Sequence, residues 1–411
     1  MLKINRRNLC NLYIITAQKI MITPIDSFDP INFRHFLHQY PELSHHERQT
    51  AALICQQLRQ FGLAPKTDLG GHGIVVKFDS NNPGETSLFR ADFDALPIHE
   101  QACHHYASCH SGIMHACGHD GHTASLMMVA KYLCLHPPIT GKVLLLFQPA
   151  EETGTGAAAM LQEPWLAQQH IDNVFAYHNL PGYPLNTLVI KPNTFACAST
   201  GVTIELFGKT SHAAKPEDGL APTLAMTEAI KLIQHLPEQF PDVFTLTTVV
   251  HASLAATAQG ETGFGTAPGY AKVLATLRSD NSHTLFAMKS LIEQQIAALC
   301  QQEQLGLEVS WQEWFNAAVN SQPHCQQVIR QARLLALPVN IIEEPMRWSE
   351  DVAEFLAKWP GALFCLGSGE QHPQLHNPDY DFPDELIATA SQLFCALIKD
   401  KHSNVSEMAV D

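Results

Sequence analysis

The stretch VLLLFQPAEE, from Val143 to Glu152, is an apolar run that ends abruptly in two carboxylates. Because Val143–Phe147 is apolar at every position, it has no side suited to water, which predicts a parallel strand covered by helices. Three other runs share this pattern: Ser87–Phe89 before Asp92, Val174–Tyr177 before His178, and Leu363–Leu366 before the loop that holds His376. The carboxyl ends of parallel strands meet at one edge of a sheet, so we expect these polar residues to form one site.

Amphipathic helices separate the predicted strands. Ile31–Tyr40 and Glu47–Phe61 carry apolar residues at three- and four-residue spacing, and His122–Leu135 has one apolar face. The last of these is suited to a crossover helix that covers the sheet. The alternation predicts an α/β fold with a mixed, largely parallel sheet.

A segment of another type interrupts this pattern between the third and fourth strands. Its elements follow the order strand, helix, strand, strand, helix, strand: Val202–Phe207, Ala221–Leu236, Phe244–Val250, Ala271–Leu277, Ser282–Cys300 and Leu307–Trp311. This is the order of a ferredoxin-like α+β unit, which can fold on its own. We therefore expect an inserted domain at 196–310 and a larger, discontinuous domain at 26–195 and 311–400, flanked by a disordered extension (1–25) and a tail (401–411).

Composition narrows the class of protein. The 411 residues include 25 Lys and Arg against 40 Asp and Glu, a net charge of −15, which disfavours binding to nucleic acid or to an anionic membrane. No apolar run approaches the roughly 20 residues needed to cross a bilayer. The 11 cysteines have no regular short spacing, which favours reduced thiols and a cytoplasmic location over a disulfide framework.

The densest chemical cluster is MHACGHDGH, Met114–His122. Cys117 and His119 are two residues apart, so their side chains would share a side only in an extended segment. We expect that segment to be extended and Asp120 to cap the helix that follows. Five Cys, His or Asp residues within eight positions indicate metal binding rather than an ordinary buried thiol.

Adjacent carboxylates form the second cluster. Glu151 and Glu152 would repel each other unless a cation or a proton gives them different roles, so one could bind metal and the other move protons. With Cys117, His119, His178 and His376, Glu152 completes a set of five side chains of types that bind zinc, manganese, cobalt or nickel. Five ligands are too many for one tetrahedral site, and two metals are therefore implied.

In these motifs the chain resembles a family of metal-dependent amidohydrolases. The family contains hippurate hydrolases, bacterial aminoacylases, N-acetyl-diaminopimelate deacetylases and auxin-conjugate hydrolases, a branch of the zinc aminopeptidase and carboxypeptidase superfamily. The resemblance covers about residues 30–398 and runs through LHQYPELSHHE, FRADFDALPIHE, GIMHACGHDGHTA, FQPAEETGTGA, GKTSHAAKPEDG and LHNPDYDF, in the family's order.

The resemblance implies a role for each site residue. It makes the five side chains named above the ligands of two divalent ions, zinc or manganese first and cobalt or nickel next. Glu151 becomes the general base and acid, and Asp92 orients the site. His212 would reach the active site of the other subunit of a homodimer joined through the inserted domain, which also serves as a lid. Arg278 would meet the substrate carboxylate.

The resemblance therefore implies hydrolysis of the amide bond of N-acyl amino acids or small peptide-like conjugates by metal-activated water. The chain departs from the family at Gly265-Thr266-Ala267-Pro268, where Asn-Val-Ile-Pro is usual. Two alternatives stay open. One is a non-catalytic dimeric metal-binding protein derived from the same fold. The other is a thiol hydrolase that uses Cys117, with His119 or His122 as its base.

Overall fold

The computed structural model describes residues 22–403 and divides the chain into two compact units. The first comprises Met1–Asn193, Val319–Glu343 and Glu354–Asp411, and the second comprises Thr194–Ala318 and Glu344–Ala353. Residues 1–21 and 404–411, which hold most of the expected extension and tail, lie outside the described residues. Within the described range, no helix is both long enough and apolar enough to cross a bilayer.

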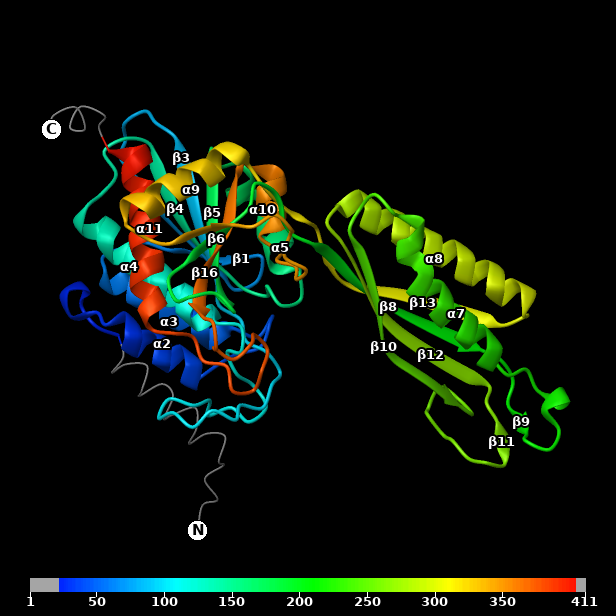
Figure 1. Ribbon diagram of the computed structural model, residues 1–411. Helices are drawn as coiled ribbons and strands as arrows, with labels where there is room; N and C mark the ends of the chain where they lie inside the picture. The colour runs from blue at the N-terminus through cyan, green and yellow to red at the C-terminus, as the bar shows by residue number, and fades with distance from the viewer. Residues whose placement is uncertain (1–21, 404–411) are drawn as a thin grey trace, which may run out of the picture. The chain divides into compact units, whose positions relative to one another are not determined.

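The first unit is built on an eight-stranded mixed sheet (Figure 1). In spatial order its strands are β1 (Lys66–Leu69), β2 (Gly73–Asp79), β4 (Lys142–Gln148), β3 (Thr86–Asp92), β5 (Asn173–Pro181), β16 (Gly361–Gly369), β6 (Leu188–Ile190) and β15 (Val339–Ile341). The four strands expected from the sequence are the neighbours β4, β3, β5 and β16, and they pair in parallel. The prediction of a mixed, largely parallel sheet is confirmed.

Helices cover this sheet because its central strands are apolar on both sides. All seven residues of β3 are buried, as are all nine of β5. The helices of this unit are α2 (Pro30–Gln39), α3 (Arg48–Gln60), α4 (His119–Leu135), α5 (Gly156–Gln162), α6 (Pro164–Ala167), α9 (Gln322–Leu334), α10 (Ala353–Lys358) and α11 (Glu385–His402). Phe89, Phe175 and Phe364 from the strands pack in one core with apolar residues of α3, α4, α9 and α11.

The second unit has the expected βαββαβ order. It consists of β8 (Ala198–Phe207), α7 (Thr223–His235), β10 (Thr245–Ala255), β12 (Tyr270–Ser279), α8 (Ser282–Gln302) and β13 (Gly306–Phe315). The sheet order is β10-β12-β8-β13, and every pairing is antiparallel. Figure 1 shows α7 and α8 side by side on one face of this sheet, where Ile233 and Met288 join a core with Val273.

The bounds of the units differ from those expected at two places. β13 runs to Phe315, so the second unit extends beyond residue 310. Residues 344–353, expected in the larger domain, group with the second unit because Met346 and Trp348 accept hydrogen bonds from the backbone of Cys197 at 3.0 and 3.1 Å. This segment is irregular, so it carries no periodicity from which the grouping could be read.

Both ends of the described chain are more ordered than expected. Thr23 exchanges two hydrogen bonds with the side chain of Gln57, at 3.0 and 2.7 Å, so the extension does not reach residue 25. At the other end, His402 is buried and lies 2.9 Å from Ser87 Oγ, which ties the end of α11 to β3.

Candidate metal centre

Cys117 and His119 lie together because the residue between them has a left-handed backbone. Gly118 has φ +92° and is the N-cap of α4, while His119 is already the first helical residue. A Cβ on Gly118 would lie 2.5 Å from Asn179 Oδ1, so this position needs glycine for its space as well as its φ. The expectation of an extended segment is therefore wrong, since a turn at Gly118 rather than a strand places both side chains beside His178.

Asp120 does not cap α4, contrary to expectation. Its carboxylate is buried and lies 3.1 Å from Arg34 Nη1 and 2.9 Å from His38 Nδ1, both on α2. These two partners outweigh the cost of burial and hold the pKa of Asp120 far below its usual range. Asp120 therefore joins α4 to α2 as an ion pair.

The ring of His119 presents one nitrogen to a group of carboxylates. Its Nδ1 lies 3.0 Å from the carbonyl oxygen of Asp94, which in the neutral ring fixes the proton on that nitrogen and leaves the lone pair on Nε2. Nε2 lies 3.7 Å from Asp92 Oδ2, 4.0 Å from Glu151 Oε2 and 3.8 Å from Glu152 Oε1. Although burial opposes the charge, Asp92 and Asp94 raise the pKa of His119 to about 10.

The surroundings of His119 Nε2 indicate whether a cation fits this site. His119 Nε2 is buried and has no hydrogen-bond partner among residues 22–403, although three carboxylates surround it. A buried polar atom without a partner is costly, and imidazole, thiolate and carboxylate are ligands of zinc and similar ions. The donor set therefore fits a divalent metal.

The turn after β4 directs Glu151 and Glu152 into this group. Ala150 has φ +52°, and its amide donates to Glu47 Oε1 at 2.8 Å, which holds the strained residue just before the pair. The amide of Glu152 donates to Asp94 Oδ2 at 3.1 Å. Both carboxylates consequently face His119 within 4.0 Å.

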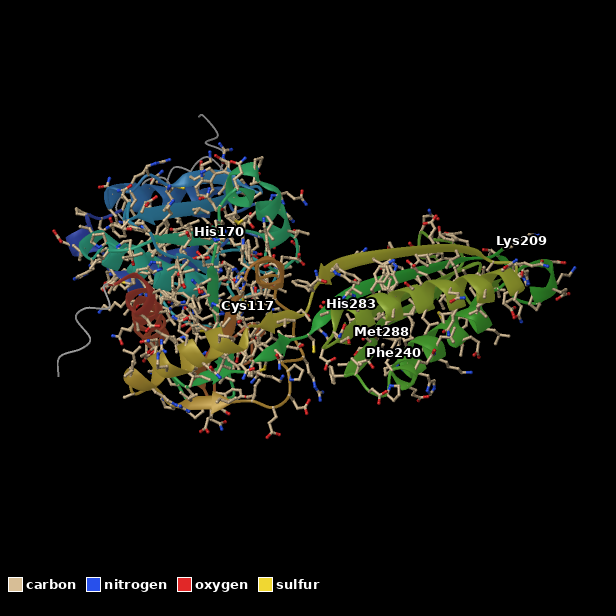
Figure 2. All side chains as sticks on the ribbon, turned by 90° about the horizontal axis from the view of Figure 1, so that it is seen from above. Cys117, His170, Lys209, Phe240, His283 and Met288 are labelled. Atoms are coloured by element: carbon tan, nitrogen blue, oxygen red, sulfur yellow. The ribbon has the colours of Figure 1, made fainter. Side chains whose placement is uncertain are left out.

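His178 and His376 complete the cluster. His178 donates from Nδ1 to the carbonyl of Asn179 at 2.7 Å, so its Nε2 faces Cys117 Sγ at 3.4 Å. Burial, and then the neighbouring His122, lower the pKa of His178 well below its usual value, which keeps it in the neutral form that binds metals. His376 Nε2 lies 3.6 Å from Glu152 Oε2. The structure thus brings all five predicted ligands together (Figure 2 shows Cys117 within the first unit).

Asp92 lies at the end of β3 as predicted and holds two neighbours. Its Oδ2 accepts from Arg90 at 2.6 Å, and its Oδ1 lies 2.6 Å from His122 Nδ1. Nε2 of His122 faces Asn179 Oδ1, which fixes the amide beside Gly118. Coulombic attraction to Arg90 and the histidines outweighs burial and keeps the pKa of Asp92 well below its usual value.

Sequence reasoning missed two residues of this centre, Asn179 and Glu47. Asn179 follows a predicted ligand directly, but its amide has no charge that would have marked it. Glu47 lies 103 positions before its partner Ala150, so no local pattern connects them. Burial raises the pKa of Glu47 to about 7.

The other two predicted residues, His212 and Arg278, lie in the second unit. His212 is exposed in β9 (Ser211–His212), which pairs with β11 (Thr266–Ala267). The amide of Ala214 donates to its Nδ1 at 3.0 Å, so in the neutral ring Nε2 carries the proton. Arg278, in β12, donates to the carbonyl of Arg347 at 3.0 Å, and burial lowers its pKa.

Residues 88–400 match the model of peptidase family M20/M25/M40. The chain belongs to this family. It is 30% identical over 370 residues to hippurate hydrolase of Campylobacter jejuni, covering 89% of this chain and 94% of the relative. It is 31% identical over 365 residues to N-acetyl-L-cysteine deacetylase of Bacillus subtilis, covering 88% and 85%.

A solved structure supports the same grouping of this M20-family chain. The YXEP protein of Bacillus subtilis, described as a dinuclear metal binding peptidase from the M20 family, superimposes with a TM-score of 0.74 at 25% identity. The match covers 90% of this chain and 96% of that one. The resemblance inferred from the sequence motifs is confirmed.

Proposed function

We propose that this family member hydrolyses the amide bond of N-acyl amino acids or related small conjugates. It is a metal-dependent amide hydrolase, as its family membership and its hippurate hydrolase and deacetylase relatives indicate. The observation that carries the proposal is the position of Glu151, which is 5% exposed and lies 4.0 Å from His119 Nε2 at the edge of the five-donor cluster. A carboxylate there reaches a water molecule beside the metal ligands.

Cys117, His119, Glu152, His178 and His376 would hold two divalent ions, with zinc or manganese as the first choice. When bound, such ions lower the pKa of a water ligand and polarise a carbonyl oxygen. Glu152 serves best as a ligand because its two oxygens face different histidines, Oε1 toward His119 and Oε2 toward His376. That division assigns proton transfer to Glu151.

Glu151 would act first as a base and then as an acid. It takes a proton from the attacking water as the carbon–oxygen bond forms, and it returns that proton to the nitrogen as the amide bond breaks. Asp92 orients the site through His122 and Arg90 rather than by touching substrate. One carboxyl group therefore both removes the proton from water and returns it to the leaving nitrogen.

His212 and Arg278 would complete the site from the inserted domain, acting as a lid. The Nε2 proton of His212 provides a hydrogen-bond donor suited to a carbonyl oxygen. The Arg278 guanidinium suits a carboxylate next to the scissile amide, which would otherwise be repelled by a chain with a net charge of −15. Both contacts are proposed for the enzyme with substrate bound.

We also propose a homodimer joined through the inserted domain. In the described part of the chain, β10 is an edge strand of eleven residues, and Val250 on it is 59% exposed. A long edge with an exposed apolar residue is a self-complementary surface for a second copy. A cytoplasmic location is proposed too, because the ten cysteines within residues 22–403 are free thiols.

Mixed dimers test whether His212 acts across the interface. His212→Ala and Glu151→Gln subunits should each be inactive alone, whereas mixing them should restore activity, because some sites then combine an intact Glu151 with a partner's intact lid. Subunit exchange is verified by labelling. Exchange without restored activity would place His212 in the site of its own chain.

The two alternatives receive less support. A non-catalytic protein has no use for a buried Glu151 beside the ligand cluster. A Cys117 nucleophile would leave the unpartnered Nε2 of His119 without a role among its carboxylates. Chelation separates the cases, because a thiol hydrolase would keep its activity after metal removal.

The deciding experiment is an amine-release assay over a panel of N-acyl amino acids. Metal-stripped protein is refilled separately with zinc, manganese, cobalt or nickel. We expect no turnover without metal and turnover of one or more acyl amino acids with it. Activity that survives complete stripping, verified by elemental analysis, would overturn the proposal.

A further inference from the structure

A second group of metal-binding side chains lies in the first unit and shares no residue with the five-donor cluster. It consists of His38 on α2 and of Glu100 and His104 in the loop between β3 and α4. Glu100 Oε1 lies 3.0 Å from His38 Nε2 and 3.0 Å from His104 Nε2, and one ligand atom of each residue lies within 4.8 Å of the others. Two nitrogens therefore converge on one carboxylate oxygen.

Each of these side chains is already held in the orientation of a ligand. His38 points its other nitrogen, Nδ1, at Asp120 Oδ2 at 2.9 Å, the carboxylate–histidine contact that commonly supports metal-bound imidazole. The second oxygen of Glu100 accepts the amide of Ser108. The ring of His104 stacks on Tyr106 with centroids 3.9 Å apart. With these contacts in place, Nε2 of His38 and Nε2 of His104 each lie 3.0 Å from Glu100 Oε1.

Two histidines of this region have buried ring nitrogens without a hydrogen bond. Nε2 of His104 lies 3.0 Å from Glu100 Oε1 as an ion pair, but neither of its ring nitrogens makes a hydrogen bond among the described residues. Both ring nitrogens of His115 likewise make none. The ring of His115, which is 1% exposed, lies 6.3 Å from that of His38. Leaving buried ring nitrogens unpaired is unfavourable, and a cation or its water ligand would satisfy them.

The charge of the surroundings also favours a cation. Three carboxylates, of Asp120, Asp381 and Asp384, pair with one obligatory cation, Arg34, and a fourth, of Glu100, pairs with His38. A divalent ion between His38, Glu100 and His104 would offset this excess of negative charge.

We propose that His38, Glu100 and His104 form a third divalent-cation site, separate from the proposed dinuclear centre. Two imidazoles and a carboxylate, with water as a further ligand, would suit zinc first, with cobalt and nickel as close substitutes. Ligand atoms about 2.0–2.2 Å from a tetrahedral ion lie roughly 3.3–3.5 Å from one another. The observed separations of 3.0 Å need to widen by only a few tenths of an ångström to admit it.

Bound there, the ion would join α2 to the loop before α4, and through Asp120 it would meet the first turn of the helix that carries His119. Its role is therefore to fix the loop and α2 against α4. It would not take part in the chemistry, because none of its ligands belongs to the five-donor cluster.

The test counts metal ions per chain in variants of the full-length protein. Wild type, His104→Leu and the matched control His105→Leu are stripped with chelator, reloaded with Zn²⁺, desalted and assayed by elemental analysis. His105 is the exposed neighbour of His104 and lies outside the group. We expect wild type and His105→Leu to hold one more ion per chain than His104→Leu.

A second variant and a second probe guard against misfolding. Glu100→Gln keeps the shape of the side chain but loses the charge, and it should lose the same single ion. Titration with Co²⁺ should give one further equivalent of visible ligand-field absorption in wild type that both variants lack. Equal metal counts and equal cobalt spectra in wild type and folded variants would overturn the third site.

Discussion

The two units of this chain carry their functional residues in opposite ways. In the α/β unit, His119, Asp92 and Asp120 are fully buried and bonded to residues from distant parts of the sequence. In the inserted unit, His212 is exposed and Arg278 is half-buried, and their contacts are within their own unit. The contrast teaches that the proposed metal ligands are fixed by buried contacts, whereas the proposed substrate contacts lie on a more exposed surface.

The largest effect is expected when each of the two adjacent carboxylates of the α/β unit is replaced in turn by an amide. Glu151→Gln should keep its metal and lose turnover by on the order of 10²–10⁴-fold, because an amide cannot accept the proton. Glu152→Gln should lose metal before anything else. Elemental analysis beside steady-state kinetics distinguishes them, and identical metal contents in both variants would refute the division of roles.

Stability should separate the buried charges from the exposed ones. Arg34→Met removes one of the two partners of the fully buried Asp120 and should lower the free energy of unfolding by about 3–5 kcal/mol. The control is Lys231→Met in the inserted unit, whose pair with Glu228 is more than half exposed and should contribute at most about 1 kcal/mol. Urea denaturation measures both. Similar losses of unfolding free energy in the two variants would show that the buried and the exposed ion pairs do not differ in this way.

The pH dependence of stability should report His38. Its pKa is about 9 in the folded protein against an ordinary value of 6.5, so its stabilisation is complete below about pH 6.5 and is lost as the pH rises through about 9. The loss should be on the order of 3 kcal/mol. The charged and titratable groups that face it are those of Asp120, Glu100, Arg34, His104, Tyr106 and His115.

This measurement is made on metal-free protein, comparing wild type with His38→Gln by urea unfolding at pH 6 and 9.5. The difference between the two proteins should shrink at the higher pH. A difference that stays constant with pH would show that His38 does not hold its proton in the fold.

A substitution on the surface of the inserted unit should have a smaller effect on catalysis, and only with one class of substrate. Arg278→Ala should lower kcat/KM by about 10- to 100-fold for substrates with a free carboxylate, the value expected for one charge-assisted contact. Carboxamide-capped analogues should be hydrolysed poorly and be little affected. If the native enzyme prefers the capped substrates, the carboxylate assignment fails.

The same contrast explains what could be predicted from the sequence. The four central strands and the grouping of the five proposed ligands were predictable because uninterrupted apolar runs and clustered Cys, His and Glu are local signals. The backbone turn at Gly118 was not, because glycine before a helix fits several conformations and only the nearby Asn179 excludes a side chain. The pairing of Asp120 with Arg34 spans 86 positions, and no local pattern encodes it.

The pairing of β5 with β16 has a consequence for how the chain is made. Val174 meets Gly361 in the sheet, and the whole inserted segment lies between them in the sequence, so the centre of the sheet cannot close until the ribosome has passed β16. The inserted unit draws its four-stranded sheet from Ala198–Phe315 alone and can fold earlier. During synthesis β5 therefore keeps one apolar edge without its partner strand until β16 has emerged, and an unpaired edge of this kind is where a folding intermediate associates with other chains.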